Sequence, residues 1–124
     1  MTIKDIEFTC YPVTNLARSR KFYEEILGLK PTSTWIQGEE GMVEYDLGNA
    51  TFVIGAGSEN FKPSKEGASV AFEVDDFDET IRRLKSLNVP FISEPNETPV
   101  CHMAIVTDPD GSAIMIHKRK ENKK

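Results

Sequence analysis

The sequence predicts an α+β fold made of two similar halves, each with the element order β-α-β-β-β. The first observation is a strand-like stretch, a helix cap and an amphipathic helix near the N-terminus. The second is the return of the same series 61 residues later, which indicates an internal repeat. The third is the turn chemistry that divides the remainder of each half into three strands. An α+β sandwich without internal duplication is the alternative.

The first half begins with alternating residues over 6–13, which predict a strand. Asn15 follows as a helix N-cap, because its side-chain oxygen can accept a hydrogen bond from a backbone N–H that lacks a partner. A helix is expected over residues 16–27, and Gly28 suits the left-handed conformation that ends it. Its buried stripe comprises Phe22, Tyr23, Ile26 and Leu27. Strands are expected at about 32–36, 42–46 and 51–55.

The second half repeats this pattern from residue 69, where residues 69–74 alternate as a strand does. Asp76 occupies the N-cap position, and Glu79 lies three residues later, close to a capping box. The helical stripe consists of Phe77, Ile81 and Leu84, and Asn88 replaces glycine at the helix end. Strands are expected at about 91–93, 101–107 and 113–118, with a tight Asp-Pro-Asp-Gly turn at 108–111.

The length of 124 residues is that of a single domain, taken as residues 1–124. Within it we expect module one at about 3–56, a linker at about 57–67, module two at about 68–118 and a basic tail at 119–124. Each module alone has only about 50 residues, which is too few to form a stable hydrophobic core by itself. We therefore expect two modules to share a sheet, either within one chain or between two chains.

Charge is distributed unevenly around the net value of −5. From Lys118 onward the chain has five basic residues and one acidic residue, whereas the preceding residues have 10 basic and 19 acidic ones. An acidic body disfavours nucleic acids and anionic membranes as partners. The tail is expected to be a solvated C-terminus, with an interaction tail as the alternative.

Several features of the sequence indicate where the protein is located and whether its cysteines form disulfides. There is no run of 18 apolar residues and no apolar leader, so we expect a cytoplasmic protein without a membrane span. Cys10 and Cys101 are far apart and form no CxxC motif, which predicts free thiols and no structural zinc site.

Three short motifs in this order are typical of one superfamily. They are the strand end at 12–15 (Pro-Val-Thr-Asn), the helix carrying Phe22-Tyr23 and ending in Leu-Gly-Leu at 27–29, and the turn at 108–111. On these motifs the chain resembles the vicinal oxygen chelate superfamily, which includes glyoxalase I, bleomycin-resistance proteins and extradiol dioxygenases. The resemblance covers residues 3–118. It implies a curved mixed sheet that surrounds a ligand cavity, and a homodimer.

The resemblance also implies where a divalent metal ion would bind in metal-dependent members. Carried over residue by residue, those positions are Phe8, Val53, Ser69 and Met115. Divalent ions prefer imidazole or carboxylate ligands, and none of the four residues provides one. We therefore expect no metal and no cofactor, and neither glyoxalase nor dioxygenase activity of the metal-dependent kind.

Alternation in the strands predicts which side chains face the cavity that the resemblance implies. The expected ligand-binding residues are Phe8, Cys10, Trp35, Val53, Ser69 and Met115. Core packing is the alternative for Cys10 and for Trp35. The face of Glu44 stays open, because its neighbours Val43 and Tyr45 look equally suited to the core.

Glu73 and His117 are the candidates for acid–base chemistry. Glu73 is expected to point inward, where a buried carboxylate needs a partner or has a raised pKa, unless the sheet edge lets it reach solvent. His117 is expected at the cavity mouth as a hydrogen-bond partner or general base, with a half-exposed strand end as the alternative.

Three functions are compatible with these residues. The first is binding of a small organic molecule in a largely apolar cavity without a divalent metal, as in the bleomycin-resistance type. The second is a lyase or isomerase acting on a small oxygenated metabolite with Glu73 or His117 as acid or base. The third is a structural homodimer without a ligand.

Overall fold

Two modules of the same topology make up the chain, in a computed structural model that describes residues 1–121. The chain divides into two compact units, Met1–Pro63 and Ser64–Lys124. Each unit has one four-stranded mixed sheet, with strand order β1-β4-β3-β2 in the first and β5-β8-β7-β6 in the second. Both β1 and β5 pair in parallel with the last strand of their own module. The predicted α+β fold with two βαβββ modules is confirmed.

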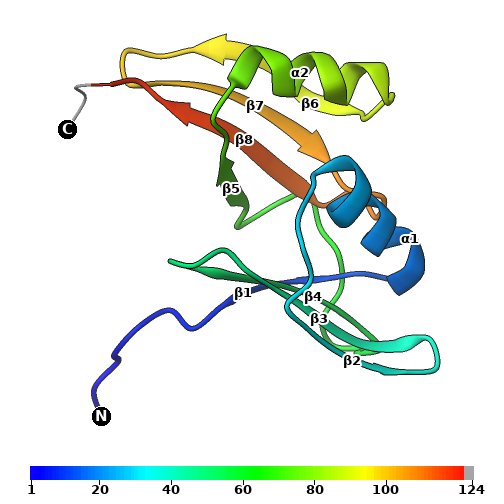
Figure 1. Cartoon of the computed structure of the whole chain (residues 1–124). Helices are drawn as coiled ribbons and strands as arrows, with labels where there is room; N and C mark the ends of the chain where they lie inside the picture. Colours follow the sequence, from blue (N-terminus) through cyan, green and yellow to red (C-terminus); the bar gives the residue numbers. More distant parts are fainter. Residues whose placement is uncertain (122–124) are drawn as a thin grey trace. The chain divides into compact units, whose positions relative to one another are not determined.

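The elements of the first module are β1 (Thr9–Pro12), α1 (Leu16–Arg20), η1 (Lys21–Ile26), β2 (Ser33–Gln37), β3 (Glu40–Asp46) and β4 (Thr51–Ala56). Those of the second are β5 (Val70–Glu73), α2 (Phe77–Ser86), β6 (Phe91–Glu97), β7 (Cys101–Thr107) and β8 (Ala113–Arg119). The first strand and the first helix of each module start 61 residues apart, as the repeat predicted. Figure 1 shows both modules.

The helix of the first module begins where the sequence predicts and changes its form in the second half. The Asn15 side chain accepts a hydrogen bond from the backbone N–H of Arg18 at 2.9 Å, which makes it the N-cap. From Lys21 the helix widens into the π-helix η1, and the N–H of Leu27 donates to the carbonyl of Phe22 five residues earlier at 2.9 Å. Apolar spacing alone does not separate this form from an α-helix.

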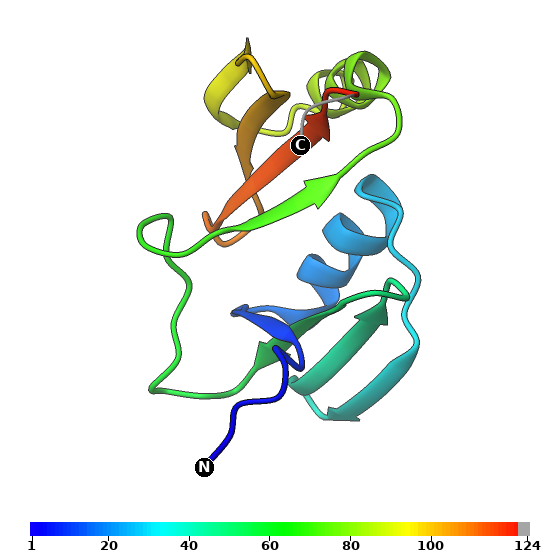
Figure 2. The same ribbon diagram turned by 90° about the vertical axis from the view of Figure 1, so that its left-hand side faces the viewer.

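Aromatic residues join this helix to one face of the first sheet. The Phe52 ring lies 5.2 Å from the ring of Tyr23 and 5.4 Å from that of Tyr11. The Tyr45 hydroxyl donates to the Glu24 carboxylate at 2.9 Å. This face therefore carries the core of the module, and Figure 2 shows the helix lying along it. The opposite face of the β1–β4 sheet is called the first open face below.

The second module is built in the same way around α2. Asp76 caps the helix by accepting a hydrogen bond from the Glu79 backbone N–H at 3.0 Å. The Phe77 ring lies 5.6 Å from the ring of His102 on β7, so His102 points toward the helix. Asn88 ends the helix with a φ of 60°, as predicted. The face of the β5–β8 sheet that points away from α2 is called the second open face.

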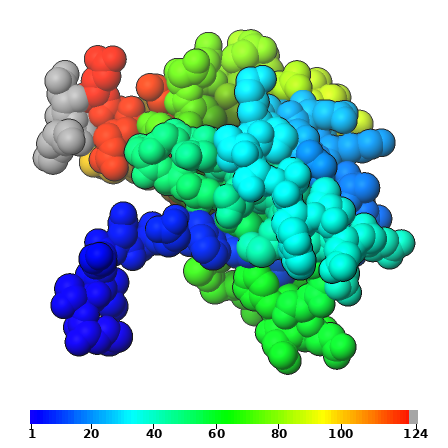
Figure 3. All heavy atoms as spheres, turned by 60° about the horizontal axis from the view of Figure 1, so that its bottom comes forward, coloured from blue at the N-terminus to red at the C-terminus, as the bar shows by residue number. Residues whose placement is uncertain are grey.

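Two strand boundaries differ from the prediction. The first strand was expected from residue 6, but β1 begins at Thr9, and residues 1–8 extend from the first module without regular structure (Figure 3). Strand β6 was expected to end near residue 93 and continues to Glu97. It tolerates Pro95 because it is an edge strand with two register shifts.

The remaining boundaries concern the C-terminus. Arg119, placed in the predicted tail at 119–124, is the last residue of β8. Residues 122–124 of that tail lie outside the described residues. Within residues 1–121, the structure has no helix long and apolar enough to cross a membrane.

Candidate functional site

The first open face carries three of the predicted ligand-binding residues. Cys10, Val53 and Glu44 are register partners across β1, β4 and β3, so their side chains share a face. In the next row, Gly55 pairs with Met42, and Met42 pairs with Trp35 on β2. Because Val43 and Tyr45 point to the core, these two rows lie on the opposite side of the sheet.

The exposure of these residues decides which of them a ligand could touch. Trp35 is 65% exposed, whereas Val53 is fully buried at 0%. Cys10 is half-buried and not in a disulfide, and burial raises the pKa of its thiol. Phe8 precedes β1 and is 45% exposed, so it does not form part of the strand that was expected to position it. Trp35 and Cys10 are thus the accessible predicted residues of the sheet itself.

The second open face brings together the two candidates for acid–base chemistry. Glu73 on β5 and His117 on β8 are direct register partners, and His117 Nδ1 lies 2.5 Å from Glu73 Oε1. The other carboxylate oxygen accepts a hydrogen bond from the backbone N–H of Arg119 at 2.7 Å. Both oxygens of Glu73 are therefore held, which fixes the side chain against the imidazole.

The charge state of Glu73 differs from the expectation. The side chain is 53% exposed, so the alternative of a solvent-reaching carboxylate holds. Burial raises the pKa of Glu73. The Arg119 N–H, His117 and Lys118 together lower the pKa by more than burial raises it, so the net shift is downward. Of the expected alternatives for Glu73, the structure therefore shows a partnered carboxylate that reaches solvent, and not one with a raised pKa.

This pairing determines which nitrogen of His117 can act as a base. An ionised carboxylate can only accept hydrogen bonds, so a neutral His117 must carry its proton on Nδ1. Its Nε2 then has a free lone pair, and the His117 side chain is 21% exposed. Met115, two residues earlier on β8, is half-buried on the same face.

The four positions to which the family resemblance assigns metal ligands do not fit a divalent ion. Phe8, Val53 and Met115 have no imidazole or carboxylate. The Ser69 hydroxyl lies 3.2 Å from the Val70 carbonyl oxygen and 3.3 Å from that of Ala113. Among residues 1–121, no three or more His, Cys, Asp and Glu side chains are grouped so that they could hold a metal ion.

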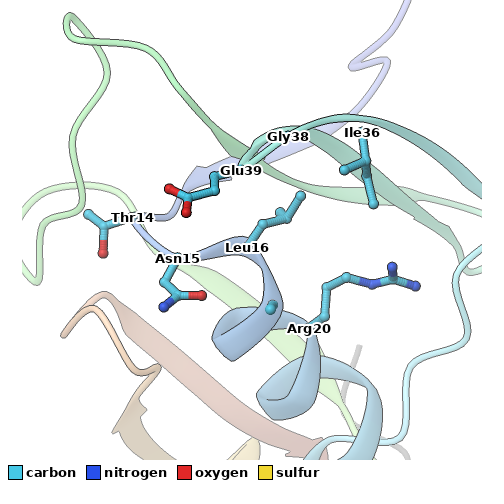
Figure 4. A pocket seen from close by; sticks show the side chains of 8 residues that line it. Thr14, Asn15, Leu16, Arg20, Ile36, Gly38 and Glu39 are labelled. Atoms are coloured by element: carbon cyan, nitrogen blue, oxygen red, sulfur yellow. The ribbon is translucent and has the colours of Figure 1, made fainter.

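A pocket of about 320 Å³ lies on the helix side of the first module, which the sequence analysis did not predict (Figure 4). Leu16 from α1 and Ile36 from β2 form its apolar walls, and Glu39 lies at the end near Thr14 and Asn15. Ile36 is the neighbour of Trp35 in the strand and points to the opposite face. This pocket is therefore separate from the first open face.

Sequence reasoning missed three residues of the first open face. Met42 and Gly55 were not considered, and the face of Glu44 was left open. The polar residues Glu44 and Asp46, which alternate with Val43 and Tyr45, could have placed Glu44. Nothing in the sequence places Gly55 beside Cys10 and Met42, because this depends on the register of three strands.

Comparison with known proteins places this architecture in a family. No curated protein matches the sequence. A family model described as Glyoxalase/Bleomycin resistance protein/Dioxygenase superfamily matches residues 5–116.

Similar solved structures are numerous, and three illustrate the range. A glyoxalase family protein from Bacillus anthracis has 25% identity and a TM-score of 0.76, covering 97% of this chain and 98% of that one. TnmS3, an antibiotic binding protein from Streptomyces sp. CB03234, has 20% identity and a TM-score of 0.76, with coverages of 97% and 99%. Lactoylglutathione lyase from Agrobacterium tumefaciens has 17% identity and a TM-score of 0.72, with coverages of 94% and 95%. With the family match over most of its length and two βαβββ modules, the chain belongs to the glyoxalase/bleomycin resistance protein/dioxygenase superfamily.

Proposed function

We propose that this protein binds a small organic molecule without a divalent metal ion. The observation that carries the proposal is the first open face, where an exposed tryptophan lies in one row with Met42 beside a half-buried thiol, Cys10. Aromatic and sulfur-containing side chains favour stacking and dispersion contacts with an organic ligand. The residues at the four expected metal-ligand positions also support binding without a metal ion, because they lack the imidazole and carboxylate groups that chelation requires.

The similarity to an antibiotic-binding protein supports this proposal without identifying the ligand. TnmS3 shares the fold over nearly the whole of both chains. A fold hosts many functions, so the chemistry of the ligand has to come from the side chains. The predicted residues Ser69 and Met115 belong to the second module and would contribute ligand contacts there.

The single tryptophan of the chain makes the proposal directly measurable. Protein freed of metal with EDTA is titrated with planar aromatic compounds of different charge while the fluorescence of Trp35 and the melting temperature are followed. We expect at least one compound to quench the fluorescence and to raise the melting temperature, because a ligand of the native state stabilises it.

Two variants distinguish binding at the open face from adsorption elsewhere. Trp35→Leu removes the aromatic surface and should abolish the ligand-induced rise in melting temperature. Phe61→Leu is the control, since Phe61 is also an exposed aromatic residue but lies outside every strand. Absence of any response across the panel, or equal loss in both variants, would contradict the proposal.

A second candidate function is favoured by the contact between Glu73 and His117. Glu73 orients the imidazole and leaves Nε2 free to remove a proton, as a lyase or isomerase acting on a small oxygenated metabolite requires. The test is hydrogen exchange in D₂O at the carbon next to the carbonyl of acetoin or dihydroxyacetone, followed by NMR. The protein should accelerate the exchange and the His117→Gln variant should not, whereas equal rates in both would exclude this function.

The homodimer that the family resemblance implies stays a prediction. Sedimentation equilibrium tests it, since a mass near twice 13.9 kDa is expected for the protein in solution.

A further inference from the structure

The first open face contains one glycine whose presence the fold does not require. Seven of the eight glycines have a positive φ, a conformation that side chains disfavour. Gly55 is the exception, because its backbone is that of an ordinary strand residue in β4. A glycine in a strand interior weakens the strand, so its occurrence there calls for a specific reason.

Packing does not supply this reason. A Cβ atom built on Gly55 would lie 3.6 Å from Cys10 Sγ, 3.7 Å from Met42 Cγ and 3.9 Å from the carbonyl oxygen of Gly41. All three distances are ordinary van der Waals contacts, so an alanine would fit. The missing methyl group leaves a small notch in the first open face, between the thiol and the methionine.

A β-bulge does not supply it either. Gly55 pairs with Pro12 in the last pair of the β1–β4 ladder and with Met42 in the β3–β4 ladder, and neither ladder has a register shift. A further recognised use of a glycine within a strand is the close approach of a ligand or of another backbone. Gly55 is partly exposed, so the notch can be reached from solvent.

The charge beside the notch indicates what kind of ligand fits. Glu44 lies on the same face, two residues from Met42 and diagonal to Trp35. Its side chain is half-buried, and no hydrogen bond or ion pair of its carboxylate occurs among residues 1–121. A partly desolvated carboxylate without a partner favours a ligand that brings a positive charge.

We propose that Gly55 is a specificity-determining residue, the floor of a subsite for a planar aromatic cation on the first open face. The flat ring system lies over the backbone of Gly55 between Cys10 and Met42, and extends toward Trp35. Neighbouring strands are about 4.8 Å apart, so Gly55 and Trp35, two strands apart, are about 10 Å from each other. A fused tricyclic ring spans this row, and Glu44 pairs with its positive charge. This inference rests on the proposed function and names its ligand class.

The test compares proflavine, a planar tricyclic cation, with 9-anthracenecarboxylate, a planar tricyclic anion, by calorimetric titration. Wild-type protein should bind proflavine more tightly than the anion. Gly55→Ala should weaken proflavine binding at least tenfold while the melting temperature stays the same or rises, because alanine is favoured over glycine in a strand. Glu44→Gln should weaken binding of the cation severalfold and leave that of the anion unchanged.

Ala56→Val is the matched control, since Ala56 is the next residue along β4 and points to the opposite face. It should leave the affinity for proflavine unchanged. If wild-type protein binds proflavine and Gly55→Ala binds it equally well, the assignment of Gly55 is overturned and the proposed function survives. A fall in melting temperature in Gly55→Ala would also overturn it, because the glycine would then serve the fold. If wild-type protein binds neither compound, nor any other of the aromatic panel, both proposals fall together.

Discussion

At the scale of single residues, the clearest structural result is the contact between Glu73 and His117, which are 44 positions apart in the sequence. Alternation along each strand places both side chains on one face. It does not reveal that they are partners, because this depends on the parallel register of β5 and β8. Burial raises the pKa of Glu73, but the Arg119 backbone N–H, His117 and Lys118 lower it by more, so the net shift is downward.

The lowered pKa of Glu73 links this contact to the stability of the protein. A group whose pKa is lower in the folded protein stabilises the fold above its ordinary value, here 4.5, and loses this effect as the pH falls through the folded value. We expect Glu73→Gln to reduce the free energy of unfolding at about pH 7. The difference from wild type should shrink as the pH falls below about 4.5. Urea unfolding between about pH 3 and 7 measures it.

The control for this experiment is Glu66→Gln, an exposed residue of the linker. It should show no pH-dependent difference from wild type. If Glu73→Gln has the same pH profile as wild type, the contacts of the Glu73 carboxylate with the Arg119 N–H and with His117 do not persist in solution.

At the scale of elements, both helices begin at side-chain caps that the sequence identifies. Asn15 and Asp76 occupy equivalent positions in the repeat, and each accepts a hydrogen bond from a backbone N–H three residues later. Capping is a local interaction within four residues, which explains why it can be read from sequence. The π-helical end of the first helix could not be predicted. A π-helix differs from an α-helix in whether each N–H donates to the carbonyl five or four residues earlier, and the spacing of apolar residues does not distinguish the two.

The cap of α2 gives a prediction about stability. Asp76→Ala removes the acceptor for the Glu79 N–H and should lower the free energy of unfolding by about 1 kcal/mol. Asp76→Asn retains an acceptor oxygen and should cost only a few tenths of that energy. Urea unfolding midpoints at about pH 7 compare the three proteins. An equal loss in both variants would show that charge, and not the hydrogen bond, is responsible.

At the scale of the whole molecule, the two modules share one topology but differ in the chemistry of their open faces. The first presents Trp35, Met42 and Cys10, and the second presents Glu73 and His117. The repeat and the element order were predictable, since they follow from periodicity and turn residues. Which residues lie side by side on these faces was predictable only in part. The positions of Gly55 and Met42 beside Cys10 and Trp35 depend on how the strands pair, which the sequence does not show.

The family adds a contrast that concerns the molecule as a whole. The family resemblance assigns the metal-ligand positions of metal-dependent members to Phe8, Val53, Ser69 and Met115, and none of these residues has an imidazole or a carboxylate. We propose that the protein binds its ligand through stacking and charge, with no metal ion between the ligand and the protein.

The most direct test is a calorimetric titration of proflavine into the protein under three conditions: with EDTA, without additions, and with Zn²⁺, Ni²⁺ or Mn²⁺. We expect the same affinity for proflavine in all three conditions, together with less than stoichiometric metal in elemental analysis of the purified protein. Loss of binding in EDTA that is restored by one of the ions would contradict this proposal.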